Sequence, residues 1–311
     1  MTDETVASGE GLPRIIVPLE VVDDKNRSRM AGLFSMLVSL AMLIAVVLQF
    51  RDLSFQAVAG MNPTYPGFWA LFALFYMIPP LSEWLIYRRL WDMPLVAGTG
   101  ALIRKLVSNE LLLGYLGEAQ FYAWARARLK FVAAPFGAIK DVTILSALVG
   151  NFATLAMLVW AWPLIASGQL GLEGRTVFIS LGVVLVTSFA ILLFRKKLFS
   201  LPKKDLWFIS AVHLARIVAY VMLSAWMWHL VLPQVEMTLW VIMATLRMLV
   251  SRLPLLPNKD VVFAGIAVFL LGHDVQIASL MTFMAVLLLV THLVVGALFA
   301  ALDLIDAEKV K

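Results

Sequence analysis

The sequence predicts an all-α membrane protein, a polytopic helical bundle of about 6–8 spans with re-entrant or broken helices in an inverted repeat. The 311-residue chain is 62% hydrophobic and has a mean hydropathy of +0.91, which exceeds what a soluble domain needs to fill one core. Its apolar runs are long and continuous, without the period-2 alternation of a membrane β-barrel. A charged, helix-breaking motif occurs twice. These three observations indicate spanning helices that are interrupted at two related places.

Spans are expected where about 20 apolar residues follow one another, because a helix rises about 1.5 Å per residue and must cross about 30 Å of hydrocarbon. The stretches that pass this test are residues 31–50, 67–87, 142–165, 176–194, 206–232 and 275–302. Two shorter or interrupted stretches, residues 96–116 and 238–272, are candidates for broken or re-entrant helices. We therefore expect a polar N-terminal segment at residues 1–30, one membrane domain at residues 31–302 and a tail at residues 303–311.

Lys and Arg residues are concentrated in segments that alternate along the predicted spans. Because these residues gather on the cytoplasmic side of membrane proteins, alternation places the N-terminus and the C-terminal tail in the cytoplasm of a bacterial inner (cytoplasmic) membrane. Residues 51–66, 166–175 and 233–237 hold few basic side chains and are expected on the opposite side. The basic segments either attract anionic lipid headgroups or only set the topology. Their basic residues are Lys25, Arg27, Arg29, Arg88, Arg89, Arg126, Arg128, Lys130, Lys140, Arg195, Lys196, Lys197, Lys203 and Lys204.

Several kinds of chemistry are excluded or lack support in the sequence. The absence of cysteine excludes disulfides, thiolate metal sites and cysteine catalysis. The histidines lack metal-ligand spacing, and the adjacent His273 and Asp274 have no serine elbow to act with. No nucleotide-binding loop is present. We therefore expect no cofactor, no metal ion, no nucleic-acid partner and no enzymatic activity.

Comparison of the chain with itself indicates an internal repeat, with one copy near residues 103–118 and the other near residues 246–260. Ile-Arg-Lys-Leu-Val-Ser in the first copy matches Leu-Arg-Met-Leu-Val-Ser in the second at four positions. Each copy continues through leucines into a helix-breaking patch and then an acid, Glu118 or, after a one-residue shift, Asp260. Three predicted spans separate the copies, so the second should enter the membrane from the opposite side. Transporters contain such inverted repeats, whose broken helices meet the cargo near the bilayer midplane.

Charged side chains in and near this motif form the candidate site. A charge at the centre of a span costs about 2.5–3.5 kcal/mol and therefore tends to face the bundle interior with a partner. In one interpretation the cations hold a lipid phosphate while the acids orient them; in the other, the same groups are ion pairs that fix the helices. Glu83, after the Pro79-Pro80 kink, either reaches the same cavity or lies at the interface. The predicted lipid-binding residues are Arg104, Glu118, Arg126, Arg216, Arg247, Arg252, Lys259 and Asp260.

Helical spacing supports two of these residues. Glu118 and Arg126 are eight residues apart, with Tyr122 between them, and therefore share one helix face. They either line one groove or form a surface salt bridge. Arg216 belongs to a polar stripe inside a predicted span, together with His213 and Tyr220. Such a stripe faces either a water-filled path or a neighbouring helix.

Residues 113–118, Leu-Gly-Tyr-Leu-Gly-Glu, with the aromatic and basic positions through Arg126, resemble the first signature of a known family. This family is the lysylphosphatidylglycerol synthase transmembrane region, the flippase-like membrane domain. Residues 251–257, Ser-Arg-Leu-Pro-Leu-Leu-Pro, with Asp260 and the apolar helix up to Gly272, resemble its second signature. The resemblance covers residues 31–302. By this resemblance, the functional positions of the family correspond to Glu118, Arg252 and the turn at residues 257–260. In that turn Pro-Asn-Lys-Asp replaces the glycine-rich turn of the family, which favours a divergent cargo.

The resemblance implies a membrane domain that moves an anionic lipid, or a lipid-linked molecule, between leaflets. Without a nucleotide-binding loop, this movement would be downhill or ion-coupled. No aminoacyl-transferase domain follows residue 302, so transfer of lysine to phosphatidylglycerol is not expected. Two alternatives stay open: a non-catalytic membrane partner of an envelope-glycan or lipid-export machine, and a lipid-modifying membrane enzyme. The expected partners are membrane lipids with anionic headgroups, with a homo-oligomer or an envelope-assembly partner as further alternatives.

Overall fold

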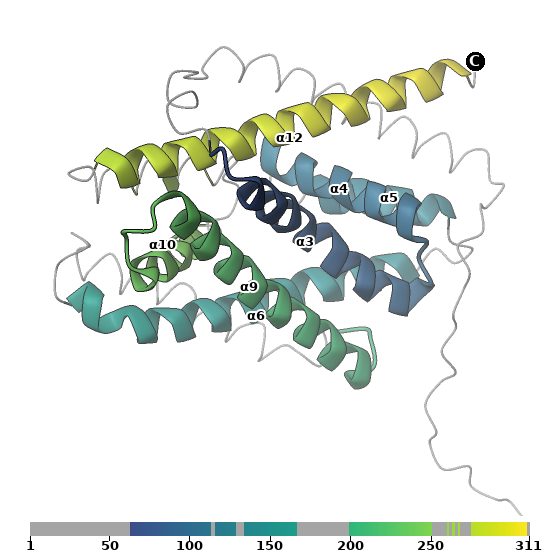
Figure 1. Ribbon diagram of the computed structural model, residues 1–311. Coiled ribbons are helices and arrows are strands. Elements are labelled where there is room, and N and C mark those ends of the chain that lie inside the picture. The colour runs from purple at the N-terminus through teal and green to yellow at the C-terminus, as the bar shows by residue number, and fades with distance from the viewer. Residues whose placement is uncertain are drawn as a thin grey trace, which may run out of the picture.

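The computed structural model describes residues 63–112, 116–128, 134–166, 199–250, 260, 263–264, 267 and 275–309. This part of the chain is all-helical, as predicted, and contains no strand. Its helices, labelled in Figure 1, are α3 (Pro66–Trp91), α4 (Leu95–Leu111), α5 (Leu116–Arg128), α6 (Ala134–Ala166), α9 (Lys203–Val231), α10 (Met237–Val250) and α12 (Val275–Lys309).

Four of the described helices are long and apolar enough to cross a membrane. The qualifying segments are Pro66–Trp91, Phe136–Met157, Lys203–Val231 and Ser279–Leu302. They lie within α3, α6, α9 and α12 and coincide with four of the spans expected from the sequence. The other two expected spans, residues 31–50 and 176–194, lie outside the described residues. The architecture is thus a helical bundle with the composition of a membrane protein.

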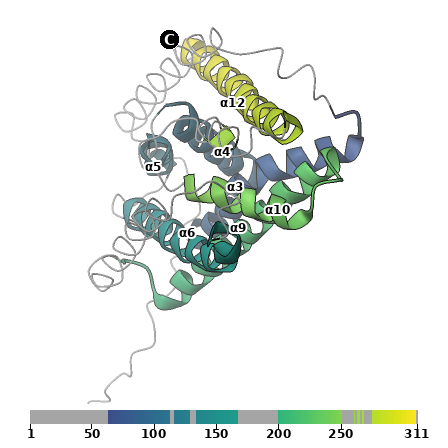
Figure 2. The same cartoon turned by 90° about the vertical axis from the view of Figure 1, so that its left-hand side faces the viewer.

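The helices form two groups that meet at α3. In one group α9 packs against α3, α6 and α10. In the other group α4 lies beside α5 and also contacts α3 and α12. Figures 1 and 2 show α12 as a long rod along one side of the bundle, with the α4–α5 pair next to it and α6 and α9 on the far side of α3. Each half of the bundle therefore contributes walls to the space beside α3.

Two apolar clusters hold these groups together. One cluster joins α3 to α9, α10 and α12 through rings that include Phe75, Trp240 and Phe283. The other lies around Tyr87 and Phe121, whose ring centroids are 4.8 Å apart, and joins α3 to α5 and α6. Large apolar side chains that point outward from the spanning helices are those that lipid would cover; Trp69, Leu74, Phe152, Leu214, Val218, Trp226, Val294 and Leu298 are examples.

Within the stretch at residues 96–116 the structure describes the end of one helix and the start of another. The helix ends at Leu111 and a new one, α5, begins at Leu116. At 17 residues α4 is only about 26 Å long, shorter than the hydrocarbon layer. The backbone N–H of Gly117 donates to Asn109 Oδ1 at 2.7 Å, which ties the start of α5 to the last turns of α4. A side chain at Gly117 would collide with the Lys105 carbonyl oxygen, so the two helices meet here with no space for a methyl group.

Candidate functional site

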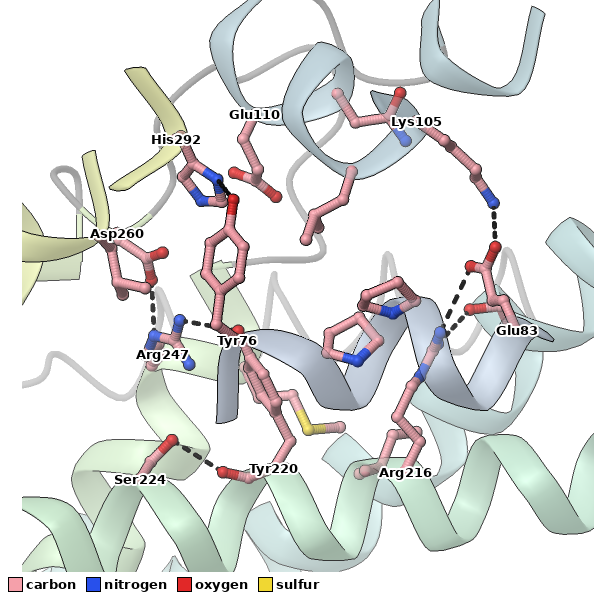
Figure 3. A pocket seen from close by; sticks show the side chains of 18 of the residues that line it. Tyr76, Glu83, Lys105, Glu110, Arg216, Tyr220, Ser224, Arg247, Asp260 and His292 are labelled. Atoms are coloured by element: carbon pink, nitrogen blue, oxygen red, sulfur yellow. Dashed lines mark hydrogen bonds and ion pairs between the residues drawn. The ribbon is translucent and has the colours of Figure 1, made fainter. Parts of the chain in front are cut away.

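A cavity of about 310 Å³ lies where the two groups of helices face each other. Its lining comes from α3, α4, α5, α6, α9, α10, α12 and Asp260, so every helix that the structure describes contributes to it. Its size is at the lower end of the range of ligand pockets, which is about 300–1,000 Å³. It would hold about ten water molecules at ~30 Å³ each. Figure 3 shows that charged and aromatic side chains point into it from all sides.

One group of charges surrounds Lys105, whose side chain is only 7% exposed. Its Nζ donates to Glu83 Oε2 at 2.7 Å and lies 3.4 Å from Glu118 Oε1. Arg216 reaches the other oxygen of Glu83, with Nη1 3.5 Å from Oε1, and its Nη2 donates to Ser146 Oγ at 2.7 Å. We call these five residues the Lys105 cluster. Through it, Glu83 on α3 links a cation of α4 to a cation of α9 (Figure 3).

A second group surrounds Arg247 on α10. Its Nε donates to Asp260 Oδ1 at 2.6 Å, and its Nη2 donates to the Tyr220 hydroxyl at 3.2 Å. The guanidinium carbon lies 5.1 Å from the ring centroid of Phe75 and 4.9 Å from that of Tyr220, and these two rings stack on each other. These four residues form the Arg247 cluster. The carboxylate and the Tyr220 hydroxyl accept hydrogen bonds from this cation, and the two aromatic rings lie against its π face.

A third feature joins α3 to α12 across the cavity. The Tyr76 hydroxyl and His292 Nδ1 are hydrogen-bonded at 3.1 Å, and both side chains are buried. Glu110, on α4, points into the cavity beside this pair (Figure 3). Near them Pro79 and Pro80 form part of the wall. Because proline has no N–H, these two residues deprive backbone carbonyls one turn earlier in α3 of their helical donors.

The structure brings half of the predicted site residues to this cavity. Glu118, Arg216, Arg247 and Asp260 line it. Arg104 does not line it; its guanidinium carbon instead lies 4.8 Å from the ring centroid of Phe299 on α12. Arg126 does not line it either, although it follows Glu118 by eight residues on α5. Arg252 and Lys259 lie outside the described residues.

The polar stripe of α9 divides between two environments. His213 Nε2 donates to the carbonyl oxygen of Val142 at 3.2 Å, a buried contact that joins α9 to α6. Arg216 and Tyr220, one and two turns further on, line the cavity. One end of the stripe therefore contacts a neighbouring helix, and the other lines the cavity.

The lining also contains polar residues that were not among the predicted site residues, including Tyr76, Lys105, Glu110 and His292. Lys105 follows Arg104 directly in the repeated motif, so its position did carry a signal. His292 is a lone polar residue inside a predicted span, and such residues tend to face the interior of the bundle, so its position could also have been inferred from the sequence. Glu83 was expected either here or at the interface, and the structure places it in the cavity. No group of three or more His, Asp or Glu side chains suited to a metal ion occurs among the residues that the structure describes.

Comparison with known proteins does not identify the chain. None of the protein-family models, curated proteins or solved structures matches it. The resemblance to the flippase-like membrane domain therefore stays a prediction that depends on the residues quoted above.

The hydrogen bond between Arg247 and Tyr220 can be tested by substitution. Tyr220→Phe removes the hydroxyl that accepts from Arg247 Nη2 and keeps the ring stacked on Phe75. We expect the free energy of unfolding to fall by about 1.5 kcal/mol, because this hydrogen bond has a charged donor. Thermal unfolding in detergent micelles measures the change. Tyr65→Phe, at a side chain that is 60% exposed, is the matched control and should have little effect; equal effects of both substitutions would contradict the prediction.

Proposed function

We propose that this chain is a flippase-like protein of the bacterial inner membrane that moves an anionic lipid, or a lipid-linked molecule, from one leaflet to the other. The single observation that supports it best is the charged cavity between helices able to span a membrane. Buried charges in such a bundle are costly and are commonly retained for a ligand path. The cavity is large enough for a lipid headgroup, while the acyl chains would stay in the bilayer.

The phosphate of the headgroup would bind at the Lys105 cluster. Arg216 offers a planar fork of N–H donors, and Lys105 offers a compact charge beside it. Both cations contact the same carboxylate, Glu83, with Lys105 also 3.4 Å from Glu118. A phosphate that enters would compete with Glu83 for these donors. Binding would therefore loosen the link between α4 and α9 that Glu83 provides.

We also propose that the two motifs are copies in an inverted repeat, within a bundle of 6–8 spans whose N-terminus is cytoplasmic. The pairing of charges supports this. Lys105 contacts Glu118, Arg247 contacts Asp260, and both acids follow their cations by 13 residues. With Lys105 rather than Arg104 as the counterpart of Arg247, the acids align without a shift. The α4–α5 hairpin would then be a re-entrant element, and lipid would cross as the two repeats rock, downhill or coupled to an ion.

A second function is favoured by the pairing of the cavity cations with carboxylates. Among the described residues, each of the three cations that line it contacts a carboxylate, as expected of ion pairs that only hold helices together. The chain would then be a non-catalytic partner of an envelope-glycan or lipid-export machine. Copurification of a stable partner, together with no lipid movement by the chain alone, would favour this alternative.

Lipid movement in proteoliposomes tests the main proposal. We expect the purified chain to accelerate exchange of a fluorescent phosphatidylglycerol between leaflets, measured by quenching of the outer leaflet. Arg216→Gln keeps a donor for Ser146 but removes the charge at the phosphate position, and should slow exchange at least about tenfold. Arg89→Gln, which breaks an ion pair with Asp205 away from the cavity, is the matched control and should leave exchange unchanged. Exchange no faster than in protein-free vesicles, or no effect of Arg216→Gln in a folded protein, would overturn the proposal.

A further inference from the structure

Of the two acids in the Lys105 cluster, Glu118 has the weaker contacts. Its Oε1 lies 3.4 Å from Lys105 Nζ, whereas Glu83 Oε2 lies 2.7 Å from the same nitrogen. Its Oε2 is buried and accepts no hydrogen bond from any residue that the structure describes. Glu83, by contrast, has a cation at each of its oxygens. Because contacts with donors and cations are what keep a buried carboxylate ionised, Glu118 loses less than Glu83 when it takes up a proton.

The groups that face Glu118 come from several helices. Lys105 on α4 is its cation, while Arg216 on α9 contacts Glu83. Both carboxylates of the cluster act electrostatically on the Tyr87 hydroxyl of α3. Helix α6 contributes Ser146, which carries no charge. The other titratable side chains of the described lining are Tyr76, Glu110, Tyr220, Arg247, Asp260 and His292 (Figure 3).

A phosphate at Lys105 and Arg216 would compete for the cation that Glu118 contacts. Lys105 has three N–H donors, and its two described contacts are both carboxylates. An anionic headgroup would thus place its phosphate beside two ionised acids in a site shielded from water, where charges of the same sign repel strongly. A proton on Glu118 removes one of these charges and one competitor for Lys105.

We infer that Glu118 is a proton-binding site, which takes up a proton from water when an anionic headgroup binds at Lys105 and Arg216. This inference rests on the proposed function and names the ion that is coupled to lipid movement. The proton returns to water when the headgroup leaves on the other side of the membrane, so lipid and proton cross together. A difference in pH across the membrane therefore drives net movement of lipid toward the more alkaline side.

Proton uptake on lipid binding tests the inference directly. The probe is dihexanoyl-phosphatidylglycerol, titrated into the full chain in detergent at about pH 7 in buffers with different ionisation enthalpies. The dependence of the binding enthalpy on the buffer gives the number of protons taken up, and we expect about one per lipid. Since the bound state then holds more protons than the free state, binding should tighten as the pH falls. The dissociation constant should be about tenfold lower for each unit of pH.

Glu118→Gln resembles the protonated acid and keeps an oxygen that can accept from Lys105. Binding to this variant should take up no proton and should not depend on pH. Glu236→Gln, at an exposed carboxylate outside the cavity, is the matched control and should keep the uptake. Binding to the unmodified chain without proton uptake would overturn the inference, even where Glu118→Gln fails to fold. Uptake that persists in Glu118→Gln would overturn it as well, because another group would then hold the proton.

Lipid exchange in vesicles separates a failure of this inference from a failure of the proposed function. With the vesicle interior about one pH unit more alkaline, fluorescent phosphatidylglycerol should accumulate in the inner leaflet, up to about tenfold over the outer leaflet. Glu118→Gln should abolish this excess. Exchange that ignores the pH difference would overturn the inference and leave the proposed function standing. The absence of both binding and exchange would overturn the two together.

Discussion

Lys105→Met should lower the free energy of unfolding by about 3–5 kcal/mol, the largest loss that we expect from a single substitution in this protein. Lys105 contacts both Glu83 and Glu118, and its side chain is nearly inaccessible. Without it these two carboxylates face each other with Arg216 as the remaining cation of the cluster. Thermal unfolding in detergent micelles measures the loss. Lipid exchange in vesicles should be lost as well, because Lys105 is one of the two proposed phosphate donors.

The reason for this effect can be separated from a loss of side-chain volume. Lys204→Met makes the same change at an exposed position and should alter stability little. Adding Glu118→Gln to Lys105→Met removes the carboxylate that loses its cation, and should recover part of the stability. If the double variant is as unstable as Lys105→Met alone, the loss does not come from the uncompensated carboxylate.

Gly117→Ala should lower the free energy of unfolding by about 3 kcal/mol, although it adds only one methyl group. That methyl would collide with the Lys105 carbonyl oxygen and lie 2.7 Å from Asn109 Oδ1. The main obstacle is backbone, which cannot rotate away as a side chain can. Relief of the collision requires α5 to move away from α4, which would also separate Glu118 from Lys105. We therefore expect lipid exchange to fall together with stability.

Gly100→Ala is the matched control for this prediction. It lies within α4, the helix against which Gly117 packs, and a methyl group there would meet nothing within 4 Å. Alanine restricts the unfolded chain more than glycine does, so we expect this variant to gain about 0.5–1 kcal/mol. Opposite signs for the two substitutions in one unfolding assay would show that the close approach of α4 and α5 matters. A similar loss at both positions would contradict the prediction, because Gly100 has no close neighbour for a methyl group to meet.

The helices were predictable because a membrane imposes few solutions on an apolar chain. Backbone groups that leave water must be hydrogen-bonded within the segment, so long apolar runs become helices. The spans at residues 67–87, 142–165, 206–232 and 275–302 follow from length and hydropathy alone, and the structure has helices there. The glycine-interrupted pattern of residues 96–116 predicted a broken helix there, and the structure describes α4 ending at Leu111 and α5 beginning at Leu116.

The site was predictable only in part, and Arg104 shows why. It aligns with Arg247 in the proposed repeat, yet its neighbour Lys105 is the residue that contacts an acid in the cavity. Adjacent residues on a helix point about 100° apart, so a shift of one position changes which helix they meet. The positions of α3 and α12 around α4 decide this: Lys105 meets Glu83 on one side and Arg104 meets Phe299 on another.

The sequence by itself determined that this chain is a helical bundle with charges buried inside it, because hydropathy and helix length depend only on the order of residues. It also indicated which charged residues need partners, since an isolated charge is unstable in an apolar bundle. The tertiary structure alone decided which cation contacts which acid and where the cavity lies. Tyr76 and His292, hydrogen-bonded across 216 positions of sequence, show the reason. Such contacts depend on how α3, α4 and α12 cross one another, and these crossings arise from side-chain shapes distributed over the whole bundle rather than from any local pattern.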